Sequence, residues 1–215
     1  MKVELRELES NVYFLKFDNQ YELTVTMLRF QEFYESAYPN IQYKYFTLED
    51  YMDTYAADQG NFTYCSDWNG FNIPSKSLMS FLEVYRGKLR DKEIQVIELL
   101  TDAILSGEKF YVIAGCEDKV IVHEMAHALY YVNEEYRENM DTLLASLPKE
   151  LMKRFTDALT EVTYSPLVHM DEVQAYCVDN FYMKENQLPN MKLKKADEKY
   201  FEQFYSLFRE YYENN

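Results

Sequence analysis

The segment VIVHEMAHALYYV, residues 120 to 132, constrains the fold more than any other part of this chain. Read as a helix, it is apolar on nearly every side, so it has no polar face to turn toward water. Such a helix must lie in a core. It nevertheless carries His123, Glu124 and His127, and these three ionisable side chains need a reason to be there.

The three ionisable residues have the spacing of a metal site. His123 and His127 lie four residues apart, so a helix presents both imidazoles on one face, as a tetrahedral zinc ion requires. Glu124 lies about 100° further around the helix, where its carboxylate reaches a metal-bound water without binding the metal itself. Zinc lowers the pKa of bound water to about 7, so Glu124 is positioned as the general base of a hydrolysis.

The alternative is a buried structural helix in which this motif occurs by chance. An unpaired glutamate in a core costs on the order of several kcal/mol or undergoes a large pKa shift. A divalent cation with its water would satisfy Glu124 and both histidines together. The metal-site hypothesis therefore explains more of the residues.

A catalytic zinc ion takes three protein ligands and leaves one position open, so a third ligand is needed. The stretch HMDEVQAYCVD, residues 169 to 179, predicts a helix that carries two candidates, His169 and Glu172. Glu172 is favoured, because Ala175 on the same helix is small enough to let another helix approach closely. His169 remains a rival ligand or a donor to a developing oxyanion, and a structural role is its third possibility.

Other side chains are candidates for supporting roles. Tyr131 lies one turn after the second motif histidine, and Tyr164 and Tyr176 lie further along the chain. Each tyrosine hydroxyl is a candidate to stabilise an oxyanion, although packing is the better explanation for each in a chain with 21 tyrosines. Asp171 and Asp179 are the candidates to hold a ligand histidine in one tautomer through a hydrogen bond.

HEMAH followed downstream by DEVQAY resembles the gluzincin branch of zinc metallopeptidases, over roughly residues 109 to 183. In that branch a helix-borne glutamate completes a His, His, Glu site, which the resemblance places at His123, His127 and Glu172. The order of DWNGFNIPS, HEMAHALYY and DEVQAY is also similar to that in uncharacterised bacterial and viral zincin-like proteins, some of which are labelled as ATPase transporters. The chain has no GxxxxGK[ST] phosphate loop, so the ATPase label is rejected.

Two features depart from the better-known gluzincins. The chain places 44 residues between His127 and Glu172, far more than the thermolysin-like pattern. Tyr176 stands where that pattern has an aspartate, so the residue that orients a ligand histidine differs from the one in that pattern.

The remainder of the chain predicts an α+β fold. VYFLKF (12 to 17) and YELTVTML (21 to 28) predict a hairpin or two adjacent strands, and KFYVIAG (109 to 115) predicts a strand that leads into the motif helix. WNGFNIP (68 to 74) predicts a structural turn that buries Trp68 or Phe71, with a substrate-binding edge strand as the alternative. Helical patterns cover residues 47–58, 73–87, 91–107, 134–147, 148–162, 170–185 and 196–212.

We therefore expect a single zincin-like domain, residues 1–215, with the motif helix at the junction of two lobes. The first lobe, residues 1–115, is expected to hold a small mixed sheet. The second lobe, residues 116–215, is expected to be mainly helical.

Charge and cysteine content restrict partners and compartment. The net charge is −15, from 37 acidic and 22 basic residues, which disfavours binding to nucleic acid or to anionic membranes. The three cysteines are distant and lack CxxC spacing, which argues against disulfides and thiolate zinc sites and favours a reducing cytoplasm. No signal-peptide core or transmembrane segment is apparent.

Together these features predict a cytoplasmic zinc-dependent metallopeptidase that cleaves peptide or protein substrates with Glu124 as the base. One alternative is a zincin-fold protein without catalytic activity, which binds metal or a protein partner. Another is a zinc amidase or esterase that acts on a small molecule, since the same activated water serves all these reactions.

Overall fold

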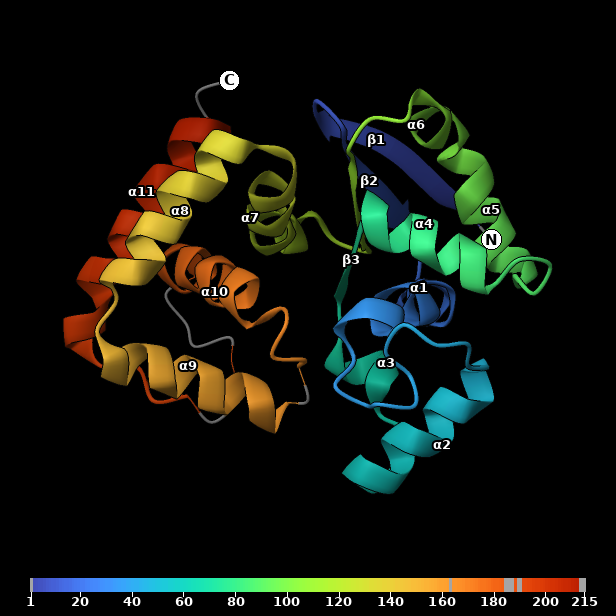
Figure 1. Ribbon diagram of the computed structural model, residues 1–215, viewed down its shortest axis with the longest axis horizontal. Coiled ribbons are helices and arrows are strands. Elements are labelled where there is room, and N and C mark those ends of the chain that lie inside the picture. Colours follow the sequence, from blue (N-terminus) through green and yellow to red (C-terminus); the bar gives the residue numbers. More distant parts are fainter. Residues whose placement is uncertain (1, 163, 184–187, 189–190, 213–215) are drawn as a thin grey trace. The chain divides into compact units, whose positions relative to one another are not determined.

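The computed structural model describes residues 2–162, 164–183, 188 and 191–212. The chain divides into two compact units, Met1–Ile121 and Val122–Asn215 (Figure 1). Unit 1 contains a β-sheet with helices, and the described part of unit 2 is mainly helical. The prediction of an α+β chain with a mixed sheet in its first half is confirmed.

The sheet of unit 1 has four strands in the order β1-β2-β4-β3. β1 (Val3–Glu9) pairs antiparallel with β2 (Val12–Phe17), β2 pairs parallel with β4 (Tyr111–Gly115), and β4 pairs antiparallel with β3 (Gly70–Pro74). Asn11 connects β1 to β2 with a φ of 64°, a left-handed conformation that asparagine tolerates. All five residues of β4 are buried, which agrees with the strand predicted from its short apolar run.

The segment predicted as a structural turn supplies β3, an edge strand of this sheet. Phe71 and Ile73 are fully buried, pairing with β4 satisfies the backbone groups on one side of the strand, and on the other side the Asn72 N–H donates to Gln31 Oε1 at 3.0 Å. Burial was predicted for Trp68 or Phe71, and Phe71 is the buried one, but the preferred prediction of a turn is wrong and the strand was considered only as the alternative.

The prediction of a strand over residues 21–28 is wrong, because these residues belong to helix α1 (Gln20–Glu35). The side chain of Asn19 caps this helix by accepting a hydrogen bond of 2.9 Å from the Glu22 N–H. The DNQ stretch thus begins a helix instead of turning a hairpin. Every residue from Leu23 to Glu35 is buried, so the helix has no solvent-facing side and its sequence lacks the alternation of polar and apolar faces that marks an amphipathic helix.

Five further helices complete unit 1: α2 (Leu48–Gln59), α3 (Tyr64–Asp67), α4 (Ser75–Val84), α5 (Asp91–Leu99) and α6 (Thr101–Ser106). Thr47 and Asp50 form the capping box that begins α2. The single helix predicted over residues 91–107 is two helices, because the backbone of Leu100 turns to φ −94° and ψ 8°. Gly107, with φ of 70°, ends α6.

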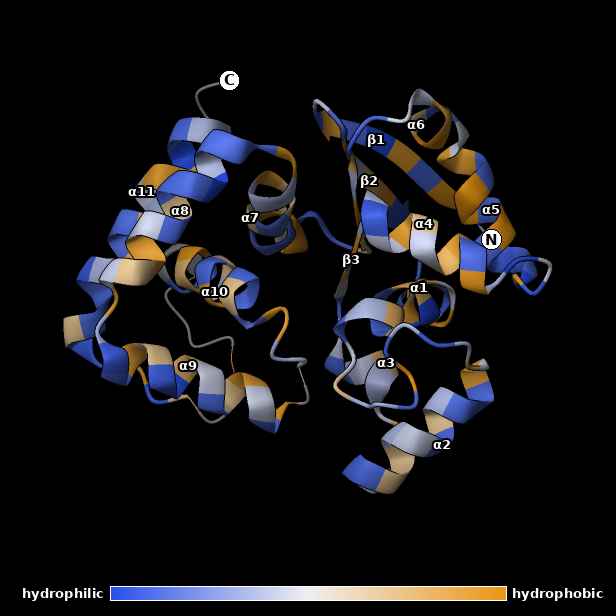
Figure 2. Ribbon diagram, viewed as in Figure 1, coloured by the Kyte–Doolittle hydropathy of each residue, from blue (hydrophilic) through white to orange (hydrophobic). Residues whose placement is uncertain are grey.

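A short 3₁₀ turn (Asp118–Val120) leads into α7 (Ile121–Val132), and four more helices follow: α8 (Glu134–Ser146), α9 (Lys149–Glu161), α10 (His169–Met183) and, after a second 3₁₀ turn (Lys195–Asp197), α11 (Glu198–Tyr212). The corresponding predicted helices are confirmed in the described residues, whereas residues 184 and 185 lie outside them. α10 contacts α8, α9 and α11 and is the central helix of unit 2. Figure 2 shows hydrophilic and hydrophobic bands alternating on α8, α9 and α11, as expected for helices that bury one face.

Across the part of the chain that the structure describes, no helix is both long enough and apolar enough to cross a membrane.

A buried ion pair ties α1 to α5 in unit 1. The Arg29 guanidinium donates to both carboxylate oxygens of Glu93, at 2.7 and 2.5 Å, and the two side chains are 3% and 0% exposed. Arg29 also donates to the Phe46 carbonyl at 3.1 Å and lies 4.5 Å above the Tyr85 ring. The Glu93 carboxylate additionally accepts the Arg90 N–H at 2.8 Å, so both buried charges are hydrogen-bonded as well as paired.

We expect Arg29→Met to destabilise unit 1 by about 3–5 kcal/mol, because it leaves the Glu93 charge buried without its partner. Chemical denaturation followed by the fluorescence of Trp68, the one tryptophan of the chain, reports on this unit. Lys2→Met is the control, since it removes only the exposed pair between Lys2 and Asp18 and should leave the unfolding midpoint unchanged. Equal midpoints for Arg29→Met and the wild type would contradict this prediction.

A second buried carboxyl group in unit 1, that of Glu32, has no cationic partner among its described hydrogen bonds. The hydroxyl of Tyr64 donates to Glu32 Oε1 at 2.5 Å. Burial raises the pKa of Glu32 from 4.5 to about 7, and hydrogen bonds from Tyr64, Tyr51 and Ser36 oppose this shift. The folded chain therefore holds a proton on Glu32 at pH values where the unfolded chain has released it.

This proton makes the stability of unit 1 depend on pH. The contribution of Glu32 to the free energy of unfolding is complete below about pH 4.5 and is lost as the pH rises through about 7, a change of roughly 3 kcal/mol. Glu32→Gln has no proton to lose and should flatten the decline. Denaturation followed by Trp68 fluorescence, between about pH 5 and about pH 8, measures how the free energy of unfolding changes with pH. Parallel pH dependences for the variant and the wild type would refute this prediction.

Candidate metal centre

In unit 2, the two motif histidines lie on one face of helix α7. His123 and His127 are one turn apart, and their Nε2 atoms lie 3.2 Å from each other. Met125, Ala126 and Ala128 around them are fully buried, which agrees with the prediction of a core helix. The side chain of His123 is 18% exposed and that of His127 only 2%, so the pair lies at the edge of the buried region.

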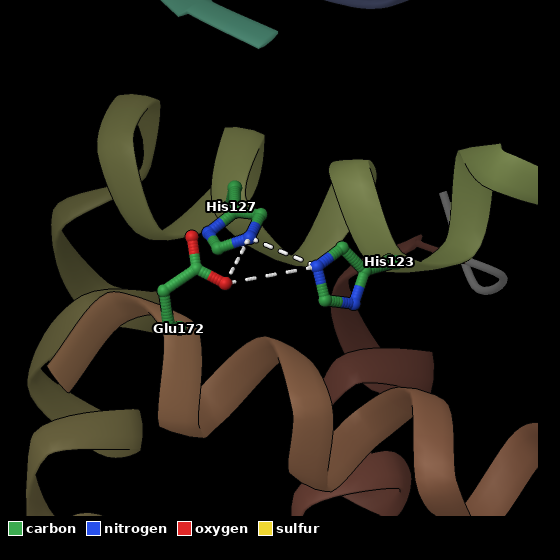
Figure 3. A group of neighbouring side chains, drawn as sticks. All are labelled: His123, His127 and Glu172. Carbon is green, nitrogen blue, oxygen red and sulfur yellow. Dashed lines mark hydrogen bonds and ion pairs between the residues drawn. The ribbon is translucent and has the colours of Figure 1, made fainter. Parts of the chain in front are cut away.

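Glu172 of α10 completes a three-residue cluster with these histidines (Figure 3). Its Oε2 atom lies 3.7 Å from His127 Nε2 and 3.9 Å from His123 Nε2. A point equidistant from the three atoms is about 2.1 Å from each, and zinc–nitrogen and zinc–oxygen bonds have lengths of about 2.0–2.2 Å. The cluster therefore has the dimensions of a site for a first-row divalent cation.

The hydrogen bonding of the cluster is incomplete in a way that a cation would correct. Glu172 Oε2 is buried and has no hydrogen-bond partner, and the same is true of His123 Nδ1. The contact between the two Nε2 atoms can be bridged by a proton or by a cation that takes a lone pair from each. Only the cation would also satisfy Glu172 Oε2, so the three residues fit a metal ion.

Burial and charge act differently on the three side chains. Burial, and then the neighbouring His127, hold the pKa of His123 well below its usual range. Burial also lowers the pKa of His127, but the carboxylates of Asp171 and Glu172 outweigh it and hold that pKa well above its usual range. Burial raises the pKa of Glu172 to about 8, with His127 opposing the shift.

Asp171 of α10 holds His127 in place. The Nδ1 atom of His127 lies 2.8 Å from Asp171 Oδ1, and because a carboxylate only accepts hydrogen bonds, this nitrogen carries the proton. The Nε2 atom is thereby available on the side of Glu172 and His123. Asp179, the other candidate for this role, lies 3.8 Å from His123 Nδ1, beyond hydrogen-bond distance.

Glu124 is 6% exposed and adds a further carboxyl group to this part of unit 2. Its charge contributes to raising the pKa of Glu172 and, after burial, the pKa of Asp179, which rises to about 6. Glu124, Asp171, Glu172 and Asp179 thus surround two histidines. Such an excess of acidic groups favours a cation at the centre.

Three further predicted residues lie in different surroundings. The ring of Tyr176 packs edge-on against the His123 imidazole with centroids 4.7 Å apart, and burial followed by the Glu172 charge raises the pKa of its hydroxyl well above the usual value. Tyr131 is half-buried, one turn after His127 on α7. His169 is outside the cluster, because its Nε2 contacts the Tyr164 carbonyl at 3.2 Å, and its predicted role as rival ligand gains no support.

Sequence reasoning missed two residues behind Asp171. The Gln174 amide donates to Asp171 Oδ1 at 3.1 Å, and the Tyr136 hydroxyl of α8 donates to Gln174 Oε1 at 3.3 Å. Both side chains are fully buried. The i, i+3 spacing of Asp171 and Gln174 on a predicted helix was the available indication, whereas nothing in the sequence connects Tyr136 to them.

Neither a protein-family model, nor a curated protein, nor a solved structure matches this chain. A functional proposal therefore rests on the geometry of the His123, His127 and Glu172 cluster.

Proposed function

We propose that this chain is a zinc-dependent metallopeptidase in which His123, His127 and Glu172 bind the zinc ion and Glu124 acts as general base. The observation that carries the proposal is the convergence of both Nε2 atoms with the buried, unpartnered Oε2 of Glu172. The gluzincin resemblance nominates the same three ligands, and we propose a zincin-like fold on that basis.

The donor set favours zinc over other abundant cations. Calcium and magnesium prefer sites made of oxygen atoms, whereas two imidazoles with one carboxylate are a common zinc set. Three protein ligands leave a position open, which is typical of catalytic zinc sites and not of structural ones. The excess of acidic groups around the site agrees with a resident dication.

The residues of the chain have distinct parts in the proposed reaction. When bound, zinc supplies Lewis acidity and lowers the pKa of water. The Glu124 carboxylate accepts a proton from the attacking water and passes it to the leaving amine. Asp171 holds the proton on His127 Nδ1, and Tyr176 keeps its own hydroxyl proton, so it can donate to developing negative charge. Tyr131 and His169 stay as predicted candidates for the same task.

The substrate class and the compartment are part of the proposal. A peptide bond is the substrate that the resemblance implies, and the acidic net charge of −15 would attract basic peptides. Cys65, Cys116 and Cys177 are free, which supports the reducing cytoplasm as the compartment.

The metal content of untagged protein tests the ligand assignment. We expect about one zinc per chain by inductively coupled plasma mass spectrometry, and a loss of zinc in His127→Ala and Glu172→Gln. His169→Ala is the matched control, since this histidine lies in α10 outside the cluster and should leave the zinc content unchanged. Absence of zinc from the wild type after zinc resupply would overturn the proposal.

Peptidase assays with a peptide library test the role of Glu124. Glu124→Gln should keep its zinc and lower kcat by at least about 100-fold, the usual contribution of general acid–base catalysis. Glu138→Gln, at an exposed position of α8, should retain wild-type activity. Full activity of Glu124→Gln would exclude the base role. A wild type that holds zinc but cleaves no peptide would support an inactive metal-binding protein or a small-molecule hydrolase instead.

A further inference from the structure

A chain of hydrogen bonds runs from the cluster of His123, His127 and Glu172 into the core of unit 2. His127 Nδ1 contacts Asp171 Oδ1 at 2.8 Å, Gln174 Nε2 donates to the same oxygen at 3.1 Å, and the Tyr136 hydroxyl donates to Gln174 Oε1 at 3.3 Å. It joins three helices, α7, α10 and α8. Among its members only Asp171 is substantially exposed, with 32% of its side chain accessible, whereas Gln174 and Tyr136 are completely buried.

The direction of each hydrogen bond in this chain is fixed by chemistry. An ionised carboxylate has no proton to donate, so Asp171 must accept from both His127 and Gln174. This forces the NH₂ group of Gln174 toward Asp171 and its oxygen toward α8. The Gln174 oxygen then needs a donor in the core, and the Tyr136 hydroxyl supplies it. If one of these groups exchanged its donor and acceptor roles, a buried polar atom would be left without a hydrogen-bond partner.

We infer that Gln174 and Tyr136 are positioning residues for metal binding, which hold Asp171 in the rotamer that fixes the proton on His127 Nδ1. This inference rests on the proposed function, because it assigns these residues to the same metal site. Gln174 stops Asp171 from turning toward solvent, and Tyr136 stops the Gln174 amide from flipping. His127 Nε2 is consequently oriented toward His123 and Glu172 before a metal arrives.

The two motif histidines differ in this respect. His123 Nδ1 is buried without a hydrogen-bond partner, and its nearest carboxylate, that of Asp179, is 3.8 Å away. His123 is restrained by packing against the Tyr176 ring instead. The hydrogen-bonded restraint on the cluster is therefore concentrated on His127, and disturbing it should weaken metal binding more than packing changes elsewhere in unit 2.

Zinc affinity, measured by competition with a chelator of known affinity, tests the inference. Asp171→Asn should weaken binding about 10- to 100-fold, and Gln174→Glu about 10-fold, since it places a carboxylate against Asp171 in a nearly unchanged volume. Tyr136→Phe should also weaken binding. Tyr211→Phe is its matched control, because the Tyr211 ring packs 5.3 Å from that of Tyr136 and its hydroxyl accepts from Asn139 instead of joining the chain. Circular dichroism identifies any variant that fails to fold.

A second measurement separates this inference from the proposed function. The chain has three histidines, so the His127 Nδ1–H proton can be assigned by ¹H–¹⁵N NMR with single substitutions. We expect a resonance protected from solvent exchange in metal-free wild type and in Tyr211→Phe, lost in Asp171→Asn and weakened in Gln174→Glu and Tyr136→Phe.

The outcomes of the two measurements are distinguishable. Wild-type zinc affinity and an unchanged resonance in folded Gln174→Glu and Tyr136→Phe would overturn the positioning role and leave the metal site intact. A wild type that binds no zinc but shows a resonance sensitive to both substitutions would refute the proposed function and keep the hydrogen-bonded chain as a structural restraint. Weakened zinc binding together with a weakened resonance supports both.

Discussion

The meeting of α7 and α10 side chains sets the main physical problem of unit 2: two histidines and four carboxyl groups lie close together, and His127, Glu124 and Glu172 among them are almost completely buried. Isolated charges in such a place cost several kcal/mol each, on the order of the whole stability of a domain. The pKa directions show how the protein limits this cost, with His127 driven toward its charged form and Glu172 toward its neutral form. A dication in the cluster would compensate the same charges without these shifts.

Compensation by a dication would couple metal binding to the folding of unit 2. The three side chains come together only in the folded chain, and a metal binds them only when they are deprotonated. The free energy of metal binding would therefore add to the stability of the folded state. α10 is the element on which this depends, since it carries Glu172 and Asp171 and also contacts α8, α9 and α11. A shift of α10 would move the proposed ligand Glu172 together with Asp171, the hydrogen-bond partner of His127.

Local patterns in the sequence predicted that His123, His127 and Glu172 come together, and they predicted the surrounding fold less evenly. The i, i+4 spacing of His123 and His127 depends only on helix geometry, so it could be read directly. The convergence of Glu172 on them needed a second helix with recognisable periodicity. The choice between Asp171 and Asp179 could not be made, because it depends on the rotation of α10 about its own axis, which tertiary packing decides.

The misassigned helix α1 has a related cause. Its buried ring of residues includes Thr24 and Thr26, whose β-branched side chains favour strands when judged locally. Burial on all sides removes the alternation between polar and apolar faces from which helices are recognised. α7 is also apolar on nearly every side, so its hydrophobic pattern alone shows only that it is buried. The positions of His123, Glu124 and His127 indicate which face carries the candidate site.

The unequal restraint on the two histidines bears on how a metal would enter the site. His127 is held by Asp171 and, through it, by Gln174 and Tyr136, whereas His123 has no described hydrogen bond at Nδ1. His123 is also the more exposed of the two. A cation arriving from solvent would meet the less restrained imidazole first and then reach the restrained His127 and the buried Glu172. The more restrained histidine is thus the more deeply buried one. Because His127 is already held in place, little side-chain entropy would be lost there when a metal binds.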